Sequence, residues 1–140
     1  MNDFFATLYE LNGIFHDIYS PLLWENGFYT KFGLIMLIIP VFVLAIFYGF
    51  ITYPKCKWWH WFLFFLAGFG TVGIMSYNML TDELATQVYN GEEGVQDFIL
   101  WLTILNVGCA ALLGFLFSFL PQFIVPNKSQ SHLPILIKRR

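Results

Sequence analysis

Three long apolar stretches organise the chain. Residues 32–54, 58–81 and 98–127 contain no Asp, Glu, Lys or Arg. Each stretch exceeds the roughly 20 residues that a helix needs to cross about 30 Å of hydrocarbon. A backbone in lipid must satisfy its own hydrogen bonds, so the stretches predict helices, and they lack the alternation of a membrane β-barrel. The pattern predicts an all-α membrane protein with three transmembrane helices plus an amphipathic N-terminal helix.

The N-terminal helix is predicted from apolar residues that recur every three or four positions between residues 3 and 23. They form one stripe: Phe4, Leu8, Leu11, Phe15, Ile18 and Leu22. A helix on the membrane surface usually carries Lys or Arg on its polar face, whereas this one carries acids such as Glu10 and Asp17. We therefore predict that the stripe from Phe4 to Ile18 docks against other protein, with a surface helix as the alternative.

These boundaries give three regions. Residues 1–27 form the amphipathic N-terminal segment, and residues 28–127 form the three-helix membrane domain. Its spans are predicted at about 32–54, 58–81 and 98–125, with an outer loop at 81–97, and residues 128–140 form a basic tail. The third stretch is longer than a span requires, and we expect Pro121 and Pro126 to end it.

The composition is typical of a membrane protein. Hydrophobic residues make up 58% of the chain and charged residues 11%, against about 25% charged residues in a typical soluble domain. The net charge of −2 provides no basic field for nucleic acid. Two cysteines are too few for a disulfide framework.

The charges also predict an orientation. All nine acidic residues lie in the N-terminal segment or the second loop, whereas six of the seven basic residues lie in the first loop or the tail. Lys31 is the exception. The positive-inside rule therefore predicts an outside N terminus, a cytoplasmic C terminus and a multi-pass protein of a bacterial inner membrane or an organellar membrane. Tryptophans fit the two predicted interfaces, where their rings act as anchors: Trp58, Trp59 and Trp61 at the inner one, and Trp24 and Trp101 at the outer one.

Small residues mark the predicted packing faces. The third span carries a small or polar residue at every fourth position, namely Asn106, Ala110, Gly114 and Ser118, and the second span carries Gly68, Gly70 and Gly73. In lipid, small residues let helices approach closely and polar side chains hydrogen-bond between helices. The stripe on the third span therefore either packs the three helices together or docks a helix of another subunit.

Candidate chemistry is sparse. Proton relays and ion-coupled transporters place ionisable groups at membrane depth, and the three spans carry no carboxylate, Lys or Arg. His60 is the candidate cofactor ligand, with His132 as a topologically permitted partner for haem. The position of His60 among tryptophans favours a role as an interfacial anchor. The acidic outer loop matches no calcium-loop motif, and we expect no cofactor and no metal.

Three functions remain open. The first is a non-catalytic integral membrane subunit with a structural or assembly role in a larger complex, such as a secretion or injection apparatus or a respiratory or transport assembly. Its partners would be other membrane subunits and the lipid bilayer. The second is a channel or transporter formed by self-association, with a polar path lined by Asn106, Ser118, Thr71, Ser76 and Asn78. The third is a membrane enzyme acting on a lipidic or quinone substrate. The sequence favours them in that order.

Overall fold

A computed structural model describes residues 1–10, 16–50, 58–85, 90–91 and 94–119. Every regular element within these residues is a helix. The elements in chain order are α1 (Asn2–Glu10), α2 (Tyr19–Glu25), α3 (Phe28–Phe50), α4 (Trp58–Glu83) and α6 (Val95–Phe117). The predicted basic tail, together with Pro121 and Pro126, lies outside the described residues.

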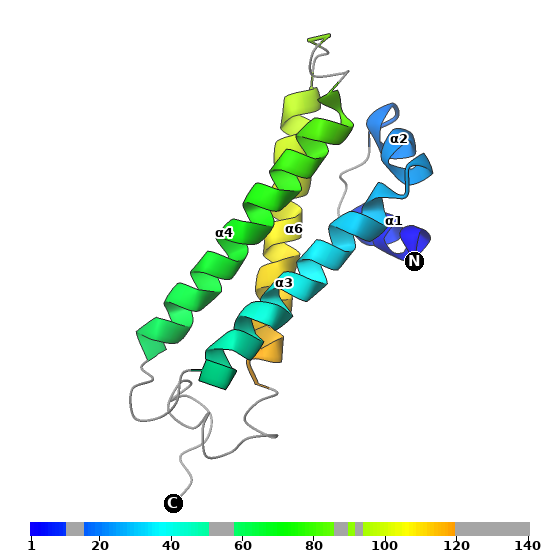
Figure 1. The fold of residues 1–140 in the computed structure, drawn as a ribbon. Coiled ribbons are helices and arrows are strands. Elements are labelled where there is room, and N and C mark those ends of the chain that lie inside the picture. The colour runs from blue at the N-terminus through cyan, green and yellow to red at the C-terminus, as the bar shows by residue number, and fades with distance from the viewer. Residues whose placement is uncertain (11–15, 51–57, 86–89, 92–93, 120–140) are drawn as a thin grey trace, which may run out of the picture.

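Helices α3, α4 and α6 lie side by side as a bundle in which each contacts the other two (Figure 1). All three are long and apolar enough to cross a membrane, so the predicted all-α fold with three membrane-spanning helices is confirmed. We call the end at Phe28, Glu83 and Val95 the acidic end, because Asp82, Glu83 and Asp97 lie there. Helices α1 and α2 pack against α3 near this end (Figure 1).

The span boundaries differ from the prediction by a few residues. Helix α3 begins at Phe28 rather than at residue 32, and α6 ends at Phe117 rather than near residue 125. Helix α4 runs through the predicted start of the outer loop to Glu83, and α6 begins at Val95. The predicted spans end at charged residues, but a helix does not have to end where its charges begin.

Helix α2 and the turn after it connect the N-terminal segment to α3. Pro21 lies in the first turn of α2, where a backbone N–H has no intrahelical acceptor to lose. Gly27 follows the helix with φ 63°, and its N–H donates to the carbonyl of Trp24 at 3.0 Å. A left-handed residue at this position ends a helix, and glycine adopts it without strain. The turn at Gly27 therefore separates α2 from α3.

Helix α1 packs against α3 mainly through a face that lies beside the predicted stripe. Phe5, Ala6 and Tyr9 are buried, whereas Phe4 of the predicted docking stripe is 69% exposed. The Phe5 ring lies directly on Gly33 of α3, where a Cβ atom would collide with the ring. Of the remaining stripe residues, Leu8 is half-buried, Ile18 is 57% exposed, and Leu11 and Phe15 lie outside the described residues. Of the described stripe residues, Phe4 and Ile18 thus face outward, whereas Leu8 packs against the buried core.

The small-residue stripe of α6 lies inside the bundle. Asn106, Ala110, Gly114 and Ser118 are all buried within the chain itself. A Cβ atom on Gly114 would lie 2.9 Å from Cε2 of Phe65 and 3.4 Å from Cβ of Pro40, so this glycine lets α3 and α4 approach α6. The chain's own helices therefore cover the stripe, which leaves no room there for a second subunit.

The central glycines of α4 divide between two surfaces. A Cβ atom on Gly68 would lie 3.4 Å from Val43 of α3, and one on Gly73 would lie 3.3 Å from Val107 of α6. Gly70 is exposed, and a Cβ atom there would meet nothing within 4 Å. Two of the three predicted packing glycines thus serve contacts within the chain, while Gly70 lies on the outer surface.

Gly114→Leu should destabilise the bundle by about 1–3 kcal/mol, because the added side chain over-packs the space held by Phe65. Gly108→Leu is the matched control on the same helix, since Gly108 is exposed with open space around it. Reversible unfolding in detergent micelles measures both. Equal stability of the two variants would contradict the packing described for Gly114.

Candidate functional site

The carboxamide of Asn106 is the polar centre of the bundle. The Tyr9 hydroxyl of α1 donates to Asn106 Oδ1 at 2.7 Å, and Asn106 Nδ2 donates to Ser76 Oγ of α4 at 2.8 Å. Asn106 Nδ2 also lies 3.5 Å from the carbonyl oxygen of Phe32 in α3. One side chain of α6 therefore contacts polar atoms of α1, α3 and α4. We call Tyr9, Ser76, Asn106 and the Phe32 carbonyl the polar node.

The polar node is sealed from its surroundings. Tyr9, Ser76 and Asn106 have no exposed surface, and aromatic rings close over the phenol. The Tyr9 ring stacks on Tyr29 with centroids 5.7 Å apart and meets the edge of Phe32 at 5.4 Å. Burial, with smaller contributions from Cys109 and Tyr29, raises the pKa of Tyr9 well above its usual range. The phenol therefore stays neutral and acts as a hydrogen-bond donor.

The sequence indicated only part of this node. Asn106 was predicted as a packing residue and Ser76 as a residue of a polar path, but Tyr9 was missed. Phe5 and Tyr9 are four residues apart and form a second apolar stripe beside the one from Phe4 to Leu8. That spacing was visible in the sequence. The sequence did not indicate which of the two stripes faces the bundle.

Ser118 forms a second polar contact at the opposite end of the stripe. The Tyr48 hydroxyl of α3 donates to the Ser118 carbonyl at 3.2 Å, and Trp61 Nε1 of α4 donates to Ser118 Oγ at 3.3 Å. Ser118 Oγ in turn donates to the Gly114 carbonyl at 2.8 Å. The far ends of α3, α4 and α6 are thus also tied together by hydrogen bonds.

The residues predicted to line a polar path do not gather on one surface. Asn106, Ser76 and Ser118 are buried and hydrogen-bonded within the chain, whereas Thr71 and Asn78 are exposed on the outside of α4. The Thr71 hydroxyl donates to the Ala67 carbonyl of its own helix at 2.9 Å. Within the part of the chain that is described, these five side chains therefore form no common path.

The histidine and tryptophan candidates lie at separate places. The His60 ring lies against Trp59, with centroids 3.6 Å apart, while His132 and the side chain of Trp58 lie outside the described residues. Trp24, Trp59 and Trp101 are exposed, but Trp61 is half-buried and donates to Ser118 Oγ. Among the described residues, no three His, Cys, Asp or Glu side chains gather into a possible metal site.

The geometry defines a class of protein: a multi-pass helical membrane protein whose internal polar groups join its own helices. No protein-family model, curated protein or solved structure matches the chain. The chemistry of the polar node is that of neutral donors and acceptors. It suits helix packing, which needs no ionisable group.

The strength of the polar node can be measured with a double-mutant cycle of Tyr9→Phe and Asn106→Leu. Asn106→Leu alone should cost about 1–3 kcal/mol, because the buried Ser76 hydroxyl loses its bond to the amide and the Tyr9 hydroxyl keeps only its weak contact with Met36 Sδ at 3.9 Å. The coupling energy between the two sites should be about 0.6 kcal/mol, with an upper value of about 1.7 for such bonds in membranes. Strictly additive effects on unfolding would show that the two side chains do not interact.

The raised pKa of Tyr9 makes stability depend on pH at the alkaline end. Below about pH 10, the usual tyrosine pKa, the phenol is protonated in both the folded and the unfolded state, and its full contribution to stability is present. As pH rises further, the unfolded chain loses this proton while the folded chain keeps it, so stability falls. Tyr9→Phe should reduce this alkaline loss in unfolding measured across the pH range. An unchanged slope would indicate that Tyr9 is not buried.

Proposed function

We propose that the chain is a non-catalytic integral membrane subunit that packs within a larger membrane complex, where it has a structural or assembly role. The outer face of α4 is the main support. Helix α4 has the lowest mean hydropathy of the three candidate spans and the smallest share buried inside the chain. A helix that faces lipid alone should be the more apolar one. The low mean hydropathy of α4, together with its large exposed share, therefore favours contact of this helix with another protein.

Small and polar side chains give this α4 face the properties of a helix-docking surface. Gly70, Thr71 and Asn78 are exposed, and Ala67 lies one turn from Thr71. Small residues allow a second helix to approach closely, and an exposed amide such as that of Asn78 can hydrogen-bond across the contact. A transmembrane helix of another subunit is the partner that fits such a surface.

Transport or catalysis by this chain alone has less support. The polar side chains at the centre of the bundle are occupied by bonds to one another. A path for ions or protons needs polar groups that face a continuous opening or can exchange protons. A channel formed by several copies, with Thr71 and Asn78 at the contact, is the second candidate because these two side chains face outward.

The proposed setting is a bacterial inner membrane or an organellar membrane. The acidic end would lie outside, because the basic residues concentrate in the first loop and the tail. The complex itself could be a secretion or injection apparatus or a respiratory or transport assembly, and its other subunits would identify the function.

The proposal predicts that Gly70→Leu weakens assembly without affecting insertion or folding. The added side chain would push a docked helix away from α4, while inside the chain it meets open space. The readout is the mass and composition of the complex after mild detergent extraction from the native membrane. Gly108→Leu is the matched control, because Gly108 is also exposed and open but lies on α6.

Three outcomes are distinguishable in that experiment. Different partner proteins, lost selectively in Gly70→Leu, would support the accessory role. A pure homo-oligomer that Gly70→Leu dissociates would contradict that role and favour the self-assembled channel. A single chain with no protein partner would contradict both, and copurified substrate turnover would favour the membrane enzyme.

A further inference from the structure

Lys31 carries a charge on the outer side of a spanning helix. It is the fourth residue of α3 and lies within the candidate span that begins at Phe28. Its side chain is exposed, and no carboxylate in the described part of the chain forms an ion pair with it. All other basic residues belong to the first loop or the tail. An unpaired charge at the edge of hydrocarbon is costly, so the environment of the chain has to supply a partner for Lys31.

The residues that follow Lys31 on the same side of α3 are apolar. Leu34, Ile38 and Phe42 follow it by three, seven and eleven residues, and this spacing places all four on one helix face. The three apolar side chains are exposed. In a membrane, such a face of a spanning helix meets lipid acyl chains. Lys31 then lies one turn beyond the first apolar residue, where the acyl chains give way to headgroups.

A tryptophan marks the same level independently. Asn2 Nδ2 donates to the Trp24 carbonyl at 2.8 Å, and Asn2 Oδ1 accepts at 3.2 Å from the N–H of Thr30, the neighbour of Lys31. These bonds hold Trp24 beside the turn of α3 that carries Lys31. The Trp24 side chain is exposed, and exposed tryptophan rings favour the headgroup layer. Both markers therefore place Lys31 at headgroup level.

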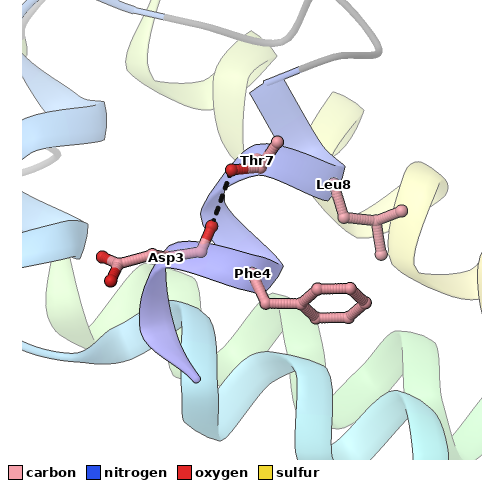
Figure 2. Close-up of a pocket in the computed structure, with 4 residues that line it drawn as sticks. All are labelled: Asp3, Phe4, Thr7 and Leu8. Atoms are coloured by element: carbon pink, nitrogen blue, oxygen red, sulfur yellow. Dashed lines mark hydrogen bonds between the residues drawn. The ribbon is translucent and has the colours of Figure 1, made fainter.

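The acidic residue of α1 nearest in sequence to Asn2 does not neutralise Lys31. The Asp3 carboxylate points to the opposite side of α1 from Phe4 (Figure 2), and its Oδ1 accepts from Trp24 Nε1 at 3.0 Å. The space one turn before Lys31 is open, because a Cβ atom on Gly27 would meet nothing within 4 Å. An anionic group can thus approach this turn from outside without displacing a described side chain.

We infer that the Lys31 ammonium binds the phosphate of a phospholipid headgroup in the leaflet at the acidic end. A lysine packs its apolar stem along a helix while its ammonium reaches outward. A phosphodiester at headgroup level supplies the negative charge, and the acyl chains of the same lipid cover Leu34 and Ile38. One phospholipid therefore satisfies both the charged and the apolar part of this face. The inference rests on the spanning helices and not on the proposed accessory role.

The test measures by solid-state NMR the dipolar coupling between the Lys31 Nζ atom and lipid phosphorus. Lysine is isotope-labelled at Nζ, and the full chain carries four substitutions that keep its charge and leave Lys31 as the one labelled lysine: Lys55→Arg, Lys57→Arg, Lys128→Arg and Lys138→Arg. One sample is reconstituted in phosphatidylcholine vesicles. The matched sample uses digalactosyl diacylglycerol, a lipid without phosphorus, with inorganic phosphate in the buffer.

Lipid phosphorus should remove most of the Lys31 Nζ signal in phosphatidylcholine, and the signal should persist in the galactolipid. A full signal in phosphatidylcholine would overturn the inference, because Lys31 would then lie in water or against protein. Equal loss in both samples would also overturn it, because free phosphate would be sufficient. Should the chain with four arginines fail to fold, the difference between the native chain and Lys31→Arg isolates the same signal.

Discussion

The carboxamide of Asn106 is the constraint on which the rest of the structure depends. A buried amide must find partners, and in a membrane no water is at hand to supply them. Here the partners come from Tyr9, Ser76 and the backbone of α3. Because each lies on a different helix, satisfying one side chain sets the positions of four helices at once. Apolar packing alone would leave the rotation and depth of these helices less well defined, since apolar contacts are not directional.

The same constraint explains why α1 packs against the bundle at one position. Its apolar inner face could rest on many surfaces, but the Tyr9 hydroxyl bonds to one amide at a fixed depth. Gly33 supports this position by leaving room for the Phe5 ring. Once α1 is held there, Phe4 on its other side is exposed, and α4 is the candidate span with the lowest mean hydropathy.

The sequence predicted the fold class because charge-free stretches of this length have few other structures available. It also predicted that Asn106, Ala110, Gly114 and Ser118 form one packing face, because a spacing of four keeps residues on one side of a helix. It could not tell whether that face meets the chain's own helices or another subunit. The sequence also could not indicate which of the two stripes of α1 faces the bundle. Gly33 and Asn106 determine that the Phe5–Tyr9 stripe does so, and both lie far from α1 in the sequence.

Tyr9 of α1 reaches Asn106 inside the helix bundle, and the other contacts of α1 depend on this bond. Nuclear Overhauser measurements on the chain in lipid nanodiscs, with asparagine side-chain amides labelled, test it most directly. We expect cross-peaks between the Asn106 amide protons and the Tyr9 ring, together with slow exchange of those protons with water. Cross-peaks from the Asn106 amide to lipid acyl chains or to water, with none to Tyr9, would contradict the account.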